Sequence, residues 1–248
     1  MDDDLGVAVD VARPVRQVVS LVPSLTEAIA ATRPEALVGA TDWCTHPAEL
    51  DVARVRGTKN PDRAAIAALV PDLVIANQEE NRELDVKRLR ADGIAVWVTR
   101  IRTLDEAFTS MRRLFDAALG WDVPSWLDEA EHAWSVPPHA TGLRVAVPIW
   151  RDPWMVVGSN TFTGDVVARL GWHNVFGDSD ERYPHVELSD IDRDDVDLVL
   201  LPDEPYVFGP DDGPEAFTHA PIALVPGRSL TWYGPSLVHA REELSRLA

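Results

Sequence analysis

Short runs of β-branched and apolar residues alternate with helical segments along this 248-residue chain, and the alternation limits the folds that it can adopt. The predicted strands cover residues 17–22, 36–40, 72–76 and 94–99, and the predicted helices between them include residues 64–69 and 84–90. Pro23 and the polar residues behind it open a further helix directly after the first strand. Strands that alternate with helices at this spacing are typical of an α/β fold, in which helices wrap a mostly parallel sheet.

The second half of the chain repeats this plan. The strand-like segments at residues 145–147, 197–200 and 222–225 follow those at residues 19–21, 72–75 and 94–97 by 126, 125 and 128 residues. We therefore predict two Rossmann-like lobes of the same topology. Chance resemblance among parallel-sheet strands is the alternative explanation.

A helical stretch separates the two predicted lobes. Apolar residues recur at helical spacing across residues 104–119, and Pro124 can open a second helix that runs through Trp134. Prolines at 137 and 138 end it, and the stretch is broken at residues 120–122. We expect an N-terminal lobe at residues 1–102, a helical bridge at 103–138 and a C-terminal lobe at 139–248. Lobes that are joined only once, by a helical tether, should rock by small amounts.

The charge and the composition exclude several classes of protein. The chain carries 23 Lys and Arg residues against 41 Asp and Glu residues, a formal net charge of −18, so we expect neither a nucleic acid nor an anionic membrane as a partner. Cys44 is the only cysteine, which excludes an intramolecular disulfide and a cysteine-rich metal site. No apolar run approaches the ~20 residues of a membrane helix. The first residues lack the pattern of a secretory signal, which predicts a cytoplasmic protein, or an extracytoplasmic one if a leader has been removed.

The motifs of common enzymes are missing from the sequence. It contains no Gly-rich dinucleotide loop, no phosphate loop that ends in Gly-Lys-Ser/Thr and no Gly-x-Ser-x-Gly turn. The seven histidines lack the spacing of a zinc site. The acidic run at residues 190–195 lacks the glycine and the distal glutamate of a calcium loop, so we expect it to form a solvated helix face. We therefore predict no catalytic residue, no metal site and no intrinsic cofactor.

Polar and aromatic residues gather where the predicted strands end. Six segments have this character, at residues 42–47, 57–61, 77–82, 150–154, 203–206 and 231–235. Open α/β sheets bind ligands at the carboxyl ends of their strands, so we expect these segments to face a cleft between the lobes. Aromatic walls with amides and a few charges suit a large, flat, amide-rich or conjugated ligand. The candidate ligand-binding residues are Trp43, Cys44, Lys59, Asn60, Glu80, Asn81, Arg82, Arg100, Trp150, Arg151, Trp154, Tyr206, Trp232 and Tyr233.

Each candidate also has a purely structural interpretation. The aromatic residues could fill the two cores, as we expect of Trp97 and Trp126, and Lys59 could be a solvated loop lysine. The segment at residues 79–82 suits a helix start, where acids stabilise the N-terminal dipole. Arg100 is expected either to line the cleft or to pair with a glutamate of that segment.

Several motifs, in their order and spacing, resemble those of the class III periplasmic binding proteins. They are Val18-Val-Ser-Leu-Val-Pro-Ser-Leu-Thr-Glu27, Gly57-Thr-Lys-Asn-Pro61, Pro71-Asp-Leu-Val-Ile-Ala76, Val157-Gly-Ser-Asn-Thr-Phe162 and Leu170-Gly-Trp-His-Asn-Val175. This helical-backbone metal-receptor superfamily binds cobalamin, haem and ferric siderophores for uptake by ABC transporters. The resemblance spans about residues 15–245 and is closest to the cobalamin-binding branch.

The resemblance implies two Rossmann-like lobes joined by one long helix, with the ligand in the cleft between them. Two features of this chain depart from the family: the bridge is broken, and no export signal is visible. The resulting hypothesis is a non-catalytic solute-binding protein that holds a cobalamin-like corrinoid, or alternatively haem or a ferric siderophore, for an ABC transporter permease. His46 or Cys44 could supply one axial contact to the metal.

Two other functions stay open at this point. A cytosolic sensor or chaperone for a small ligand would keep the fold and would agree with the missing leader. An enzyme that acts in the cleft would need a paired acid and base, for which the sequence offers only Glu79, Glu80 and His46.

The net charge of −18 also bears on the ligand. An acidic surface repels an anionic siderophore at long range. Such a ligand would need a local gathering of the candidate cations Lys59, Arg82, Arg100 and Arg151. A nearly neutral, amide-fringed corrinoid needs no such cluster, so the charge favours a corrinoid.

Overall fold

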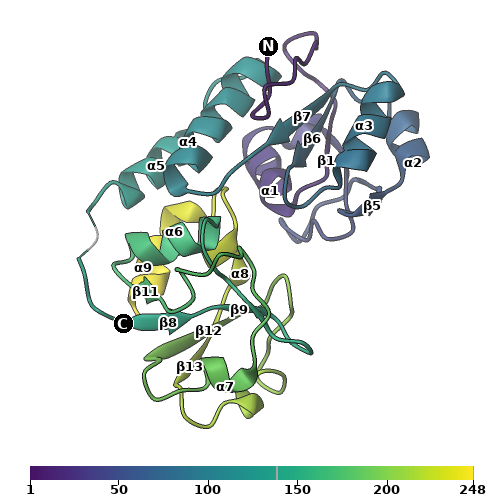
Figure 1. Cartoon of the computed structure of the whole chain (residues 1–248). Helices are drawn as coiled ribbons and strands as arrows, with labels where there is room; N and C mark the ends of the chain where they lie inside the picture. The colour runs from purple at the N-terminus through teal and green to yellow at the C-terminus, as the bar shows by residue number, and fades with distance from the viewer. Residues whose placement is uncertain (138, 248) are drawn as a thin grey trace. The chain divides into compact units, whose positions relative to one another are not determined.

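The computed structural model describes residues 1–137 and 139–247 and divides into two compact units (Figure 1). The first unit contains Met1–Ile101, Asp105–Asp128 and Tyr233–Pro235. The second contains Arg102–Leu104, Glu129–Trp232 and the C-terminal segment that begins at Ser236. Each unit has its own mostly parallel sheet and its own buried core. The predicted α/β fold with two lobes is therefore confirmed.

Five parallel strands form the sheet of the first unit, in the order β3-β2-β1-β6-β7. They are β1 (Val18–Ser20), β2 (Leu37–Ala40), β3 (Ala53–Arg54), β6 (Leu73–Asn77) and β7 (Val96–Thr99). Its helices are α1 (Pro23–Thr32), α2 (Arg63–Ala68) and α3 (Glu83–Ala91), with a 3-10 turn at Pro34–Ala36. Every residue of β1, β6 and β7 is buried, as expected of parallel strands covered on both faces. The predicted strands of this lobe are confirmed to within two residues.

The sheet of the second unit has four parallel strands in the order β11-β8-β12-β13. They are β8 (Arg144–Ala146), β11 (His173–Asn174), β12 (Leu198–Pro202) and β13 (Ile222–Val225). The helices are α6 (Phe162–Arg169), α7 (Leu188–Ile191), α8 (Gly227–Thr231) and α9 (Leu237–Ser245), with a 3-10 turn at Pro214–Ala216. An antiparallel hairpin of β9 (Pro148–Trp150) and β10 (Met155–Val156) follows β8. β8 lies between β11 and β12 as β1 lies between β2 and β6, so the two halves share the topology that the sequence repeat predicts.

Two helices with a turn between them lie where the sequence predicts the bridge. α4 (Leu104–Arg113) continues into a π-helical turn (Leu114–Leu119), and α5 (Ser125–Trp134) follows. Gly120 has a left-handed backbone with φ of 65°, and a Cβ on it would lie 3.0 Å from the Arg13 side chain, so a glycine ends the helix. The predicted break is therefore confirmed. The expected stop at Pro138 lies outside the described residues, and the lobe boundaries at 102 and 138 stay a prediction.

The expectation that the chain joins the two lobes only once is wrong. Asp105–Asp128 belongs to the first unit although Arg102–Leu104 belongs to the second, and Tyr233–Pro235 returns to the first unit from the C-terminal half. A Cβ on Gly234 would lie 3.0 Å from the backbone oxygen of Ser24, so the missing side chain permits a close approach to α1.

In the part of the chain that the structure describes, no helix combines the length and the apolar character that crossing a membrane requires.

Candidate ligand-binding site

The polar segment after β6 is locked into the first unit by one amide. Asn81 is only 5% exposed. Its Nδ2 donates to the carbonyl oxygens of Thr58 at 2.9 Å and Leu21 at 3.3 Å, and its Oδ1 accepts from the backbone N–H of Asn77 at 2.8 Å. These internal bonds occupy both ends of the amide, so Asn81 holds the turn at Thr58 against the ends of β1 and β6.

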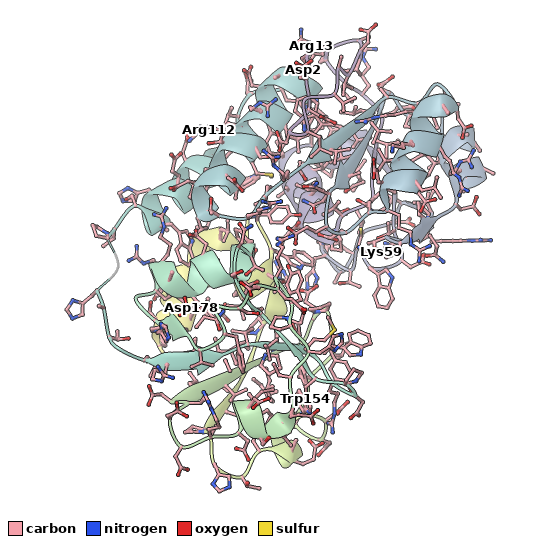
Figure 2. The ribbon with its side chains drawn as sticks, in the orientation of Figure 1. Asp2, Arg13, Lys59, Arg112, Trp154 and Asp178 are labelled. Atoms are coloured by element: carbon pink, nitrogen blue, oxygen red, sulfur yellow. The ribbon has the colours of Figure 1, made fainter. Side chains whose placement is uncertain are left out.

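The turn that Asn81 holds carries an exposed aromatic residue and a lysine. It joins the antiparallel strands β4 (Arg56–Gly57) and β5 (Asn60–Pro61). A Cβ on Gly57 would lie 3.4 Å from Nε1 of Trp43, so the indole lies against the turn. Trp43 is 63% exposed, and Lys59 is exposed beside β5 (Figure 2). This edge of the first unit therefore offers an aromatic surface, an amide from Asn60 and a cation.

The segment that returns to the first unit places a buried phenol beside an acid. Tyr233 is 6% exposed, and its hydroxyl donates to Oε1 of Glu80 at 3.4 Å. Burial, together with the Glu80 carboxylate, raises the pKa of the Tyr233 phenol well above its usual value. The phenol is therefore a neutral hydrogen-bond donor at physiological pH.

Cys44 occupies the interior of the same region and has no exposed surface. Its Sγ lies 3.0 Å from Oγ1 of Thr26, which donates to it, and 3.1 Å from Oγ1 of Thr41. Burial raises the pKa of the Cys44 thiol, although both threonines oppose the shift. In this structure the thiol fills the core, so its predicted contact with a ligand finds no support in the geometry.

The two arginines predicted beside this site lie in different places. Arg82 directly precedes α3 and lines a depression that Lys59 and Asn60 also line. Arg100 follows β7, and its backbone N–H donates to Oδ2 of Asp4 at 3.1 Å. It lines a second depression, of about 320 Å³, with Asp4 and residues of α4. Arg100 is therefore not gathered with Lys59 and Arg82.

In the second unit, the turn after β9 is held by Arg151. Its guanidinium donates to the carboxylates of Asp212 and Glu215, the latter at 2.6 Å, and lies 5.5 Å from the ring centre of Trp154. The Tyr206 hydroxyl donates to Oδ2 of Asp212 at 2.7 Å, and this bond raises the pKa of Tyr206. The charge of Arg151 is thus compensated within the protein by two carboxylates, and its contact with a ligand stays a prediction.

The six aromatic candidates divide into an exposed and a buried group. Trp43 is 63% exposed, Trp150 is 45% exposed, and Tyr206 is partly exposed. Tyr206 packs edge-on against Trp150, with the two ring centres 5.4 Å apart. The buried group consists of Trp154, Trp232 and Tyr233. Trp154 stacks on Phe208 with ring centres 6.0 Å apart. The Arg228 guanidinium lies over Trp232, 5.7 Å from the centre of its ring. These two tryptophans belong to the core, as the structural interpretation expected; so does Trp97, which is fully buried.

Three acids in the second unit have roles that the sequence did not reveal. Asp212 and Glu215 hold Arg151. Asp192 follows α7, and its carboxylate accepts from the backbone N–H groups of Thr218, His219 and Ala220 at 2.8–2.9 Å. The expectation of a solvated helix face is therefore wrong for Asp192, because the helix ends before it.

Within residues 1–137 and 139–247, no group of three His, Cys, Asp or Glu residues is placed to hold a metal ion.

Comparison with known proteins finds relatives in sequence and in fold. No protein-family model matches the chain. A vitamin B12-binding protein of Pectobacterium atrosepticum is 26% identical, in an alignment that covers 75% of this chain and 71% of that protein. A vitamin B12-binding protein of Vibrio cholerae is 24% identical, with 72% and 67% covered.

Solved structures extend the comparison to almost the whole fold. The periplasmic vitamin B12-binding protein BtuF of Vibrio cholerae superimposes with a TM-score of 0.72 at 20% identity and covers 94% of this chain and 96% of its own. The periplasmic heme-binding protein RhuT of Roseiflexus sp. RS-1 gives 0.73 at 21% identity, with 93% and 97% covered. The chain therefore has the fold of these periplasmic binding proteins and is similar in sequence to vitamin B12-binding proteins, which confirms the resemblance seen in its motifs.

Proposed function

We propose that this protein is a non-catalytic solute-binding protein that holds a cobalamin-like corrinoid or a similar metal chelate for ABC-type uptake. The observation that carries the proposal is the sequence similarity to vitamin B12-binding proteins, which spans 75% of the chain. The structural neighbours with this fold include proteins named for vitamin B12 and for heme, so haem is the nearest alternative ligand. The relatives are binding proteins by name, and none of these names describes an enzyme.

The side chains at the ends of the strands support this function. Each unit presents an exposed tryptophan beside polar groups: Trp43 in the first, and Trp150 with Tyr206 in the second. Indole and phenol rings stack on flat conjugated systems, and amides and cations bind the polar groups at their edges. The proposed contact residues are Trp43, Lys59, Asn60, Glu80, Arg82, Trp150, Tyr206 and Tyr233. In this proposal Asn81 and Arg151 hold the segments that carry these contacts, and the buried Cys44, Trp154 and Trp232 belong to the interior.

The site of action that we propose is outside the cytoplasmic membrane, with an ABC transporter permease as the partner. This rests on the structural neighbours, which are periplasmic by name. The alternative of a cytosolic sensor has no support among these relatives.

A ligand panel tests the proposed function. Aquocobalamin, cyanocobalamin, haem and a ferric siderophore are added in turn, and the melting temperature and tryptophan fluorescence are measured. A true ligand at 100 times its dissociation constant stabilises the folded protein by about 2.7 kcal/mol and should raise the melting temperature visibly. Trp43→Ala and Trp150→Ala should weaken the effect, whereas Trp126→Phe, on α5, serves as a control. If no chelate changes either signal, the proposed function is wrong.

A further inference from the structure

A depression in the first unit gathers basic side chains on an otherwise acidic protein. It has a volume of about 640 Å³ and is lined by the β4–β5 turn, α2, Arg82 and α3. Its lining contains five basic side chains and only three aspartates, in a chain whose formal net charge is −18. This local excess of positive charge is the opposite of the overall charge.

Three of the five basic side chains are compensated by the three aspartates. The salt bridges are Arg56–Asp62 at 3.4 Å, Arg63–Asp92 at 2.7 Å and Arg88–Asp85 at 3.6 Å. The two that remain are Lys59 and Arg82. Within the described residues, neither of them forms a salt bridge with a carboxylate. Among the side chains that line the depression, the excess positive charge is therefore located on this pair, while the Glu80 and Glu79 carboxylates act on Lys59 from outside the lining.

Lys59 and Arg82 are close enough to influence each other. The Lys59 ammonium donates to the backbone carbonyl of Glu79, which fixes it at the end of β6. Partial burial lowers the pKa of this ammonium, the Glu80 carboxylate opposes the shift, and the positive charge of Arg82 adds to it. Glu80 also accepts the Tyr233 hydroxyl, and neither Glu79 nor Glu80 is part of the described lining of the depression. An anion bound beside Lys59 and Arg82 would offset both the burial and the mutual repulsion of the two cations.

The exposed indole of Trp43 adds a second kind of contact at the same turn. It lies against Gly57, two residues before Lys59. An aromatic surface beside two cations that form no salt bridge within the described residues matches a ligand with a flat body and an anionic substituent on its edge.

We propose that Lys59 and Arg82 form a subsite for one anionic oxygen group, a phosphate or a carboxylate, on the periphery of the bound chelate. The inference rests on the proposed function and adds the chemistry of one ligand substituent to it. Lys59 supplies a compact charge held by the Glu79 carbonyl. Arg82 supplies the planar pair of N–H groups that phosphates and carboxylates accept in bidentate form.

Two pairs of matched ligands test the subsite and distinguish the two sources of the anion. Cyanocobalamin carries a phosphate diester in its nucleotide loop, and dicyanocobinamide has the same corrin ring without that loop. Haem carries two carboxylates, and its dimethyl ester carries none. Dissociation constants are measured for the wild-type chain and for Lys59→Met, Arg82→Gln and the double variant. Lys87→Met and Arg63→Gln are the controls, because Lys87 pairs with Glu83 at 2.6 Å and Arg63 with Asp92.

We expect the double variant to bind the anionic member of one pair at least about tenfold more weakly than the wild-type chain does. The affinity of each single variant should lie between those of the wild type and the double variant. Its affinity for the matched neutral ligand should change by less than about twofold, as should the affinity of both controls for either ligand. A loss confined to cyanocobalamin identifies a phosphate, and a loss confined to haem identifies a carboxylate. An unchanged affinity of the double variant, or an equal loss for both members of a pair, overturns the subsite while leaving the proposed function intact.

If the wild-type chain binds neither corrinoid nor haem, the proposed function fails and inorganic phosphate decides the subsite. Melting temperatures are then compared in phosphate and chloride at the same ionic strength. A rise specific to phosphate in the wild type that the double variant lacks supports the subsite. The same melting temperature in both anions overturns it.

Discussion

Asn81 shows what the end of a parallel strand requires of a single side chain. Beyond the last ladder bonds of β1 and β6, the carbonyls of Leu21 and Thr58 and the N–H of Asn77 need partners, and one amide satisfies all three. Cys44 fills the adjoining interior between two threonine hydroxyls. A short polar residue after a strand can therefore serve the fold as readily as a ligand. Sequence position does not separate these two roles.

We expect Cys44 to be inert toward thiol reagents in the folded protein. Burial excludes the reagent and raises the pKa of the thiol, so the reactive thiolate is scarce. Labelling by iodoacetamide at pH 8 should be about 100-fold slower in the native chain than in concentrated guanidinium chloride. Rapid stoichiometric labelling of the native protein would contradict the buried position of Cys44.

Asp192 should make stability depend on pH in the acid range. Burial raises its pKa, but the hydrogen bonds from Ala220, Thr218 and His219 outweigh burial and lower the pKa from 3.8 to about 2. A folded-state pKa below the unfolded value means that this contribution is complete above both values and is lost as the pH falls from about 4 toward 2. Asp192→Asn should therefore cost about 1–2 kcal/mol at pH 7, allowing for solvent screening.

The measurement is urea denaturation of Asp192→Asn and the wild type at pH 7 and at several values between 4 and 2. The difference between the two curves should shrink as the pH falls. Asp194→Asn is the matched control, since the Asp194 side chain is 96% exposed and should change the free energy of unfolding by less than about 0.5 kcal/mol. A cost for Asp192→Asn that is independent of pH would show that the carboxylate charge is not responsible.

At the scale of elements, the β9–β10 turn and the segment around Asp212 are fastened by one guanidinium. Arg151 pairs with Asp212 and Glu215, and Asp212 also accepts the Tyr206 hydroxyl. Trp150 packs edge-on against Tyr206, so the exposed aromatic surface depends on this arrangement. The hairpin therefore presents its aromatic side chains from a held position.

Removing the guanidinium should loosen this region measurably. Arg151→Met leaves Asp212 and Glu215 without their shared cation and should lower the free energy of unfolding by about 2 kcal/mol. Arg151→Lys keeps the charge but loses the planar fork, so about half that loss is expected. Arg193→Met removes a more exposed pair with Asp195 and should cost less than about 0.5 kcal/mol. Urea denaturation followed by circular dichroism gives the values, and equal values for Arg151→Met and Arg193→Met would contradict the role of Arg151.

The strands and helices could be predicted because each depends on local pattern: β-branched runs, helical spacing and glycine or proline at the ends. The break at Gly120 belongs to this class, since glycine alone adopts its backbone conformation readily. The partners of Arg151 could not be predicted in this way, because Asp212 and Glu215 lie 61 and 64 residues further along the chain. The burial of Trp154 likewise depends on Phe208, in another loop. The return of Tyr233–Pro235 to the first unit depends on the close approach of Gly234 to the backbone of Ser24. The hydrophobic periodicity of the sequence does not predict this contact.

At the scale of the whole molecule, 41 acids against 23 basic residues create a self-repulsion that favours unfolding. Salt should therefore stabilise this protein. Raising NaCl from about 0.01 M to about 0.15 M shortens the Debye length from about 30 Å to about 8 Å, and the melting temperature should rise by a few degrees. Choline chloride at equal ionic strength should act alike, because the effect is screening. A fall in melting temperature would mean that the screened salt bridges outweigh the net charge.

Whether the protein holds a metal chelate is decided by equilibrium dialysis of the purified chain against coloured ligands. The prediction is saturable retention of one cyanocobalamin, or failing that one haem, per chain, with dicyanocobinamide competing for the same site as cyanocobalamin. Trp43→Ala and Trp150→Ala should each reduce the retained amount at a fixed free concentration. If aquocobalamin, cyanocobalamin, haem and a ferric siderophore all equilibrate equally across the membrane, the protein is not a receptor for these chelates.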